Sequence, residues 1–452
     1  MNATEALTER LRVEQLLLPG MAGYEEVVAI WNGAVENRPA VVVHCESTAD
    51  VQAVVHIAGE FGLPLSVRGG GHDWAGRSLA HDGVVIDLTG MRQVSVDAEA
   101  RAATVGGGAL ISDLIAATQP HELSAATGTY GGVGLAGLTL GGGYGPINGV
   151  AGLALDNLLG AEVVLADGRV VDTDDDPELF WALRGGGGNF GVVTELRVRL
   201  HPIPTVLAGF IMFSWTEAAA VLRAFGNQIT DAPDELTAQF SVVTGPADEP
   251  VLMIAPTWSG DPAAGEKVIA QLEQLGTPLM SQVGPMPYQG ILDLYEPFIE
   301  NGLHVVIQTR SLAAIDDDAV EAVVRAVESM PGKKCLISTH HCHGASTRVP
   351  LEATAFGLRQ PHFVVEIVPM WDPDQDGPAH QRWAREFSDA LAPFALPGGY
   401  PNLLGPDERE QLDEAYGANA TRLRAAKAKY DPANVFTAIG LPEAEEEPHL
   451  RG

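Results

Sequence analysis

The first part of the chain alternates buried strands with amphipathic helices. Residues 40–43 form a run rich in β-branched side chains, which is typical of a buried strand. Ser47 follows as a helix N-cap, and the apolar positions between 51 and 58 fall on one helical face. Residues 63–67 are the next predicted strand. This β-α-β unit is expected to deliver a glycine-rich loop at its carboxyl end, with main-chain donors aimed at one point.

The pattern changes at residues 201–204, which read His-Pro-Ile-Pro. Beyond them glycine clusters are few, and strand patterns alternate with helix patterns. Strands are predicted at 251–254, 305–309, 335–339 and 363–368, and helices at 217–226, 266–275 and 318–330. This order favours an antiparallel sheet with helices on one face. The tail returns to the glycine-rich style, so we predict three segments, at 1–204, 205–396 and 397–452.

The composition is that of a globular protein that avoids polyanions. The chain has 452 residues, of which 46% are hydrophobic and 19% charged, enough for two domains. A formal net charge of −32 repels nucleic acid and anionic membranes. No apolar run approaches the roughly 20 residues that span a bilayer, and no secretory signal is evident. Three cysteines form no disulfide framework, so we expect a cytoplasmic protein. A monomer or a homodimer is also expected.

Glycine-rich loops indicate a cradle for a phosphate-bearing cofactor. Residues 69–71 are three glycines, whose N–H groups can approach an anion closely, and His72 follows them. Residues 132–137 match G-x-G-x-x-G, the dinucleotide-binding fingerprint. However, residues 124–130 are not a hydrophobic strand, and the glycines at 141–143 would break the required helix. A long open loop around a diphosphate or a flavin ring is therefore favoured over a nicotinamide Rossmann fold.

Five motifs in this order resemble those of the vanillyl-alcohol-oxidase/PCMH superfamily, in its berberine-bridge-enzyme-like branch. The segments are RGGGH at 68–72, GGGYG at 141–145, DNL at 156–158, GNFGVVT at 188–194 and YDPANVF at 430–436. With these segments, the chain is similar to bacterial hydroxynicotine oxidases and to polyketide-tailoring flavoenzymes of secondary metabolism. The resemblance implies an α+β fold, with a PCMH-type FAD-binding domain of two α/β subdomains. A substrate domain with an antiparallel sheet and helices on one face would complete it.

The resemblance also implies how FAD is held. The expected cofactor-binding residues are Arg68, Gly69, Gly70, Gly71, His72, Asp73, Tyr130, Gly141, Gly142, Gly143, Asn189, Gly191, Val192, Val193, Asn402 and Asn434. In the family, the histidine that matches His72 is bonded to the 8α-methyl group of FAD. Many members add a cysteine tether within the glycine-rich run, where this chain has Tyr130. We therefore expect monocovalent FAD, attached through His72 alone.

The catalytic base is open between several side chains. Relatives often carry a carboxylate on an insert strand, where residues 336–343 of this chain have none. Tyr400 ranks first, because the resemblance places its tail segment beside the flavin. Glu366, an acid inside an apolar strand, and His341 are the alternatives. Tyr130, at the tether position, is expected near the flavin ring and could hydrogen-bond a substrate.

Three histidines between residues 340 and 343 raise the question of a metal site, because imidazole is the commonest zinc ligand. On a strand, His341 and His343 would share one face and His340 the other. No further ligands are evident nearby. A structural role, or an acid/base role in the active site, is therefore favoured, and no metal is expected.

The expected function is that of an FAD-dependent oxidase. A C–H bond next to O or N in a small alcohol, amine, sugar or secondary metabolite would deliver hydride to the flavin. O2 would reoxidise the flavin and yield hydrogen peroxide. Two alternatives stay open: a flavin-bound cyclase without net oxidation, and a non-catalytic flavin-binding protein. Peroxide release with turnover distinguishes the oxidase from both.

Overall fold

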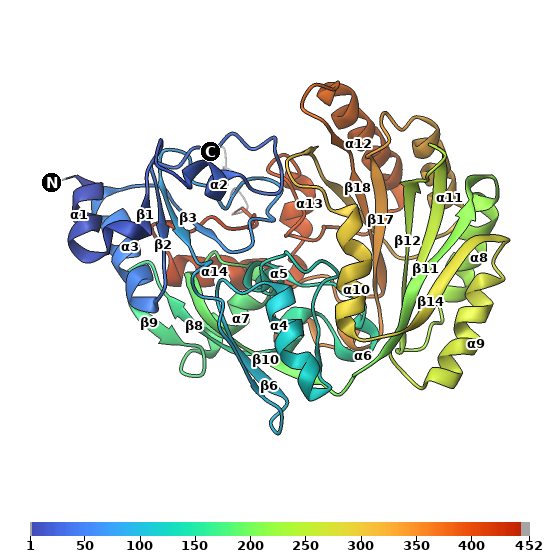
Figure 1. The fold of residues 1–452 in the computed structure, drawn as a ribbon, viewed down its shortest axis with the longest axis horizontal. Coiled ribbons are helices and arrows are strands. Elements are labelled where there is room, and N and C mark those ends of the chain that lie inside the picture. Colours follow the sequence, from blue (N-terminus) through green and yellow to red (C-terminus); the bar gives the residue numbers. More distant parts are fainter. Residues whose placement is uncertain (1, 444–452) are drawn as a thin grey trace, which may run out of the picture.

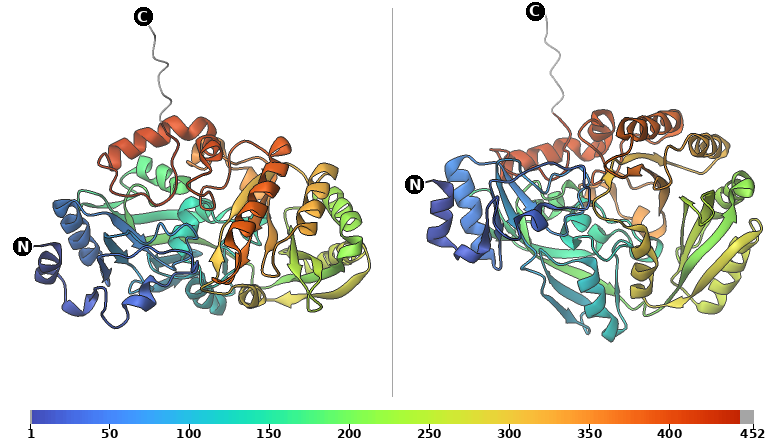
Figure 2. Two further views of the ribbon diagram at one scale, coloured as in Figure 1. Left: turned by 90° about the horizontal axis from the view of Figure 1, so that it is seen from above. Right: turned by 45° about the horizontal axis from the view of Figure 1, so that its top comes forward.

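The computed structural model describes residues 2–443, which form two lobes (Figure 1) with a cavity between them. The first lobe contains two sheets and the second lobe one large sheet. The tail returns to the first lobe, where α14 (Ala420–Tyr430) packs against α7 (Pro177–Gly186), as Figure 2 shows from two further sides. None of the described helices is both long enough and apolar enough to cross a membrane.

The first sheet confirms the predicted β-α-β unit. Its order is β1-β2-β4-β3, and β2, β4 and β3 run parallel. The strands are β1 (Leu16–Leu17), β2 (Val41–His44), β3 (Leu65–Arg68) and β4 (Val84–Asp87). Helix α3 (Thr48–Phe61) links β2 to β3. The Ser47 side chain accepts a hydrogen bond from the Asp50 N–H at its start, and Gly62 is left-handed at its end. Helix α1 (Ala3–Arg10) packs on α3.

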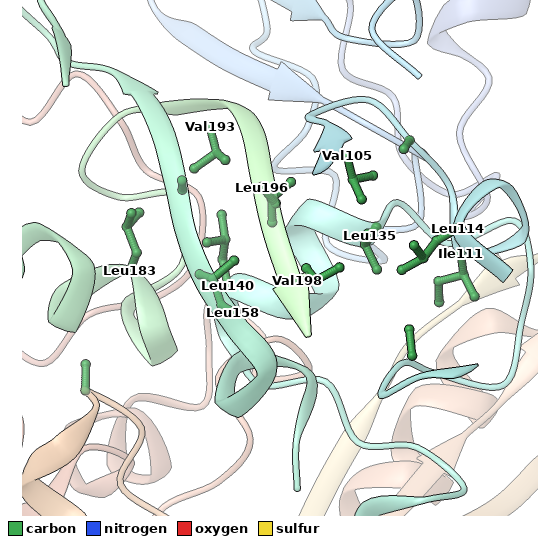
Figure 3. Close-up of a cluster of buried hydrophobic side chains, with 14 of the residues drawn as sticks. Val105, Ile111, Leu114, Leu135, Leu140, Leu158, Leu183, Val193, Leu196 and Val198 are labelled. Carbon is green, nitrogen blue, oxygen red and sulfur yellow. The ribbon is translucent and has the colours of Figure 1, made fainter. Parts of the chain in front are cut away.

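The second sheet is antiparallel, in the order β5-β6-β10-β8-β9, with β7 on the far end of β10. Its strands are β5 (Val94–Asp97), β6 (Ala102–Gly106), β7 (Ser124–Ala125), β8 (Leu158–Val164), β9 (Val170–Asp172) and β10 (Val192–His201). A hairpin that turns at Asp167 and Gly168 joins β8 to β9. Figure 3 shows apolar side chains of this sheet, such as Leu196, packed toward α4 (Ile111–Thr118) and α5 (Leu135–Gly141).

The third sheet has seven strands, all antiparallel, in the order β14-β11-β13-β12-β17-β18-β16. They are β11 (Val206–Ser214), β12 (Leu236–Thr244), β13 (Pro250–Trp258), β14 (Pro278–Met286), β16 (Gln308–Leu312), β17 (Leu336–Cys342) and β18 (His362–Val368). One face packs against α8 (Ala218–Ile229), α9 (Pro262–Glu273), α11 (Asp317–Glu328) and α12 (Gly377–Leu391). The expected sheet with helices on one face is thereby confirmed.

Tertiary contacts divide one of the predicted strands. Residues 305–309 form two pieces, the end of β15 (His304–Val305) and the start of β16. The Asn32 side chain exchanges two hydrogen bonds of 2.9 Å with the backbone of Val305, and β15 pairs with β19 (Met370–Trp371) instead of joining the large sheet. The first lobe therefore detaches β15 from the strand that its sequence predicts.

Candidate functional site

The cavity between the lobes has a volume of about 470 Å³ and two contrasting walls. Loops of the first lobe and the tail, rich in glycine, form one wall, called here the glycine wall. The bare face of the third sheet forms the other, called the sheet wall, with side chains from β12, β13, β17 and β18. The segment at the end of α10 (Tyr288–Tyr295) and just beyond it contributes Tyr295, Phe298 and Ile299.

The glycine wall brings separate glycine loops together. Gly70 and Gly134 touch through their backbones, and a Cβ at Gly134 would lie 2.6 Å from the Gly70 nitrogen. Gly69 and Gly137, in contrast, border the cavity, and a Cβ there would have no neighbour closer than 3.9 Å. This bare backbone surface fits the diphosphate and ring system of FAD, because no side chain keeps an anion from the N–H groups.

The G-x-G-x-x-G segment at 132–137 belongs to this wall and not to a Rossmann unit. The strand before it, β7, has two residues and pairs with β10. The helix that it opens, α5, has seven residues and ends in the glycines at 141–143. The strand–loop–long helix geometry that a nicotinamide dinucleotide requires is not formed here.

His72 lies on the glycine wall between two aromatic rings. It stacks on Trp31 with 5.4 Å between ring centroids, and it meets the ring of Tyr130 edge-on at 5.0 Å. Burial lowers the pKa of His72 to about 4, so its imidazole is neutral at pH 7. The neutral form has a nitrogen lone pair free to bond to an electrophilic carbon. Tyr130, at the tether position, is therefore the direct neighbour of His72.

The two charged residues predicted beside the glycines differ in position. Arg68 does not border the cavity, since its Nη1 donates a hydrogen bond of 3.0 Å to Asp87 on β4. Asp73 does border it, and its carboxylate pairs with Arg77 at 2.6 Å. Arg77 also donates a hydrogen bond of 3.2 Å to the Asn402 carbonyl. The Asp73–Arg77 pair thus ties the histidine loop to the tail.

The glycines at 141–143 pack against the tail instead of bordering the cavity. The N–H of Gly143 and the amide of Asn402 donate hydrogen bonds of 2.9 and 3.0 Å to the phenol oxygen of Tyr400. A Cβ at Gly142 would lie 2.5 Å from the Tyr400 ring. Tyr400 and Asn402 themselves border the cavity. Burial raises the pKa of Tyr400 to about 12, although the two donors favour its ionised form, so the phenol is protonated at neutral pH.

Two further predicted cofactor residues shape the tail. Asn189 donates a hydrogen bond of 2.9 Å to the Ile439 carbonyl and accepts one of 2.9 Å from the Ala438 N–H, which holds residues 436–439 against the glycine wall. Asn434 is exposed in the turn after α14, with a left-handed φ of 52°. The expected cofactor residues that border the cavity are Gly69, Gly70, Gly71, His72, Asp73, Tyr130, Gly191, Val192, Val193 and Asn402.

The sheet wall carries an ion pair between Glu366 on β18 and His340 on β17. Nε2 of His340 lies 3.0 Å from Oε1 of Glu366, and the side chains are 24% and 17% exposed. Burial lowers the pKa of His340, but the charge and hydrogen bond of Glu366 outweigh it, so the pKa ends above its usual value. Both residues border the cavity, so the carboxylate and the imidazole are available to a molecule bound there.

His341 lies on the opposite face of β17 and does not border the cavity. Its ring stacks on Phe363 at 4.6 Å and on His343 at 3.9 Å, and burial holds its pKa well below the usual range. His340, which we did not predict as a site residue, takes the cavity position. The sequence contained a signal for this position of His340. On a strand, His340 lies on the same face as Ser338, a small polar residue in an otherwise apolar strand pattern.

Tyr144 is a second residue that sequence reasoning missed, although it lies within the GGGYG motif. Its ring stacks on His340 at 5.7 Å and meets Tyr400 edge-on at 4.8 Å. Its hydroxyl donates a hydrogen bond of 2.8 Å to Nε2 of His362, because Nδ1 of His362, 2.7 Å from the Gln360 carbonyl, carries the ring proton. Tyr144, which also borders the cavity, therefore supports His340 and Tyr400 through ring contacts.

Thiol and metal chemistry find no support at this cavity. Cys45, Cys335 and Cys342 are buried and free, and none of them borders it. Within residues 2–443, no group of three or more His, Cys, Asp and Glu side chains is arranged to hold a metal ion.

Two family models match this chain. One, described as an FAD binding domain, matches residues 39–174, and the other, described as berberine and berberine like, matches residues 399–438. The first covers much of the glycine wall, and the second covers the tail segment with Tyr400 and Asn402. The FAD assignment therefore agrees with the bare backbone surface of the cavity.

Known proteins match over nearly the whole length. FAD-linked oxidoreductase aurO of Gibberella zeae is 31% identical over 96% of this chain and 87% of its own. (R)-6-hydroxynicotine oxidase of Paenarthrobacter nicotinovorans is 31% identical over 93% of this chain and 95% of its own.

Solved structures agree with these sequence matches. The crystal structure of 6-hydroxy-D-nicotine oxidase from Arthrobacter nicotinovorans superposes with a TM-score of 0.86 at 30% identity, covering 94% of this chain and 96% of that one. BBE-like 1 of Physcomitrella patens shares the fold, with a TM-score of 0.87 at 24% identity over 98% of this chain and 100% of that one. The chain therefore belongs to the berberine-bridge-enzyme-like family of FAD-linked oxidoreductases.

Proposed function

We propose that this protein is an oxidase that takes hydride from a C–H bond next to O or N in a small organic substrate, with O2 as the final electron acceptor. The observation that carries the proposal is the Glu366–His340 pair on the sheet wall of the cavity whose other wall fits FAD. A carboxylate within hydrogen-bond reach of a substrate can accept the proton that leaves with the hydride. Bound FAD supplies the electron acceptor for that hydride.

The chain's own residues have distinct roles in this proposal. Glu366 accepts the substrate proton, and His340, 3.0 Å away, holds the carboxylate in place by donating a hydrogen bond. Tyr400 is protonated at neutral pH, so we assign it as a hydrogen-bond donor to the substrate and not as the base. Glu366 therefore takes the place of Tyr400 as the proposed base, because a protonated phenol cannot accept the substrate proton.

We further propose a single covalent bond between FAD and His72. The support is the neutral imidazole on the glycine wall and the absence of a cysteine from the described cavity lining. Tyr130, in ring contact with His72, fills the position that carries the second tether in many relatives. A cytoplasmic location and a monomeric or dimeric state stay predictions from the sequence.

Anaerobic mixing of the purified holoenzyme with a panel of alcohols, amines, sugars and phenols tests the proposal. A true substrate bleaches the flavin, and admission of air restores its colour with one peroxide per turnover. Glu366→Gln should slow bleaching about 10²–10⁴-fold, the range usual for general acid–base catalysis. Tyr400→Phe should slow it less and leave the flavin spectrum intact. Product without bleaching or peroxide would indicate the cyclase, and binding without product the non-catalytic protein.

A further inference from the structure

We infer that the substrate is an apolar molecule with one hydroxyl or amino group at its reacting carbon, and that the sheet-wall side of the cavity rejects carboxylates, phosphates and sugars as substrates. The inference rests on the proposed function and specifies its substrate class. Three features of the cavity carry it: the position of its polar groups, the character of the surface around them, and its lack of a free cation.

Three polar side chains of the sheet wall form a row across neighbouring strands, with His340 two residues along β17 from it. Ser241 on β12 pairs in register with Ser338 on β17, and Ser338 pairs with Glu366 on β18. The two serine hydroxyls lie 3.2 Å apart and bond to each other. Gln239, the remaining polar side chain of β12 at the cavity, donates a hydrogen bond of 2.8 Å to the Tyr295 hydroxyl. One small polar group of a substrate can therefore be satisfied here, beside Glu366.

Apolar side chains surround this row. Leu336 and Val368 pair in register on β17 and β18, two residues from Ser338 and Glu366, and both border the cavity. Val243 and Met253 border it from β12 and β13, and Phe298 and Ile299 border it after α10. An apolar substrate body gains from contact with these groups. A sugar would bury hydroxyls against them without hydrogen-bond partners, which is unfavourable.

The cavity also lacks a cation that an anionic substrate could use. Arg77 is the one Arg or Lys side chain among the described residues that border it. Arg77 is committed to Asp73 at 2.6 Å and to the Asn402 carbonyl at 3.2 Å. His340 is committed to Glu366, whose negative charge repels an anion at the polar row. A carboxylate that reached the sheet wall would lose its hydration without compensation.

The test uses three probes with the wild-type holoenzyme. They are 4-isopropylbenzyl alcohol, its carboxylated counterpart 4-(hydroxymethyl)benzoate, and D-glucose. Binding is measured under anaerobic conditions as the perturbation of the visible flavin spectrum or, for a probe that reacts, as the concentration dependence of bleaching. We expect the isopropyl probe to bind at least about 100-fold more tightly than either of the other two, given the cost of burying an unpaired charge or unsatisfied hydroxyls.

A designed reversal provides the matched variants. Leu336→Lys places a cation on the apolar part of the sheet wall, and it should bind the carboxylated probe at least tenfold better than wild type while losing affinity for the isopropyl probe. Leu336→Met, of similar size and still apolar, should keep the preference for the isopropyl probe. Flavin content and thermal midpoint of each variant report whether it is folded.

Binding of the probes tests the substrate class, and bleaching of the flavin tests the oxidase activity. A preference for the isopropyl probe without bleaching by any compound supports the substrate class and counts against the oxidase. Bleaching by glucose or by the carboxylated probe at equal affinity supports the oxidase and overturns the substrate class. Failure of every probe to bind also overturns the substrate class, because the apolar surface would then provide no affinity.

Discussion

At the scale of single residues, Glu366 controls the charge state of the histidine beside it. The negative charge of Glu366 keeps the pKa of His340 above its usual value in a position where burial alone would lower it. Since the unfolded chain has an ordinary histidine pKa of about 6.5, the folded protein binds the His340 proton more tightly. The pair therefore adds stability that is fully present below about pH 6.5 and is lost as the pH rises through the folded pKa.

The corresponding prediction compares wild type with Glu366→Gln. The difference in free energy of unfolding between them should be largest below about pH 6.5 and should shrink as the pH rises. Urea titrations at several values between about pH 5 and pH 8 measure it. In a His340→Gln background, Glu366→Gln should lose this pH dependence. A difference that is constant with pH in the wild-type background would contradict the assigned pair.

His72 is the second residue with a separable role. His72→Ala should fold and bind FAD non-covalently, because the bare backbone of the glycine wall is unchanged. After acid precipitation, flavin should stay with wild type and with Tyr130→Phe and should wash out of His72→Ala. Mass spectrometry of the peptide around His72 should show one flavin adduct. Wild-type protein that releases all of its flavin would refute the covalent bond.

At the scale of elements, the turn after α14 sets the position of the tail on the cavity. The buried carboxylate of Asp431 accepts hydrogen bonds of 2.9 and 2.8 Å from the N–H groups of Val435 and Phe436. Lys427, one turn earlier in the helix, pairs with Asp431 at 2.6 Å and donates a hydrogen bond to the Phe436 carbonyl. The YDPANVF motif thus caps the turn that follows α14, and Asn434 supplies the residue of this turn with a left-handed φ.

Removal of this cap should loosen the tail from the cofactor. Asp431→Ala removes the carboxylate that pairs with Lys427 and should lower the free energy of unfolding by about 3–5 kcal/mol, as for other broken buried pairs. It should also weaken FAD retention in a His72→Ala background, where no covalent bond masks the change. Asn434→Gly, compatible with the left-handed φ, is the matched control and should retain flavin. Equal flavin loss in both variants would indicate that the Asn434 side chain itself contacts the cofactor.

At the scale of the whole molecule, a buried ion pair joins the lobes. Arg359, just before β18, donates hydrogen bonds of 3.0 and 2.8 Å to the two carboxylate oxygens of Asp156 in the first lobe. Their side chains are 6% and 8% exposed, and neither borders the cavity. The DNL motif therefore helps to fix the glycine wall and the sheet wall relative to each other, through the ion pair of Asp156 with Arg359.

Loss of one partner should leave the other charge buried and unpaired. Asp156→Asn should lower the free energy of unfolding by about 3–5 kcal/mol, measured by urea titration with flavin and tryptophan fluorescence. The double variant Asp156→Asn with Arg359→Met removes both charges and should recover part of this loss. A double variant less stable than Asp156→Asn alone would show that Arg359 stabilises the protein independently of Asp156.

The sequence by itself determined the fold class and the segments that form the glycine wall. Each depends on local chemistry, since runs of β-branched residues make buried strands and bare glycines permit close backbone contact. The β-α-β unit that leads to His72 is correct for this reason. The family motifs added the FAD assignment, which the comparisons support.

Only the tertiary structure decided which motif residues reach the cavity. The family motifs also contain Arg68, Asn189 and the glycines at 141–143, which hold loops together because their partners lie on other segments. Asn434 serves the turn after α14 through its left-handed φ. Strand alternation places His340 and His341 on opposite faces, but it does not say which face the helices cover. Helix packing buries His341 against Phe363 and leaves His340 to Glu366, a partner on another strand that only the register of the sheet brings within 3.0 Å.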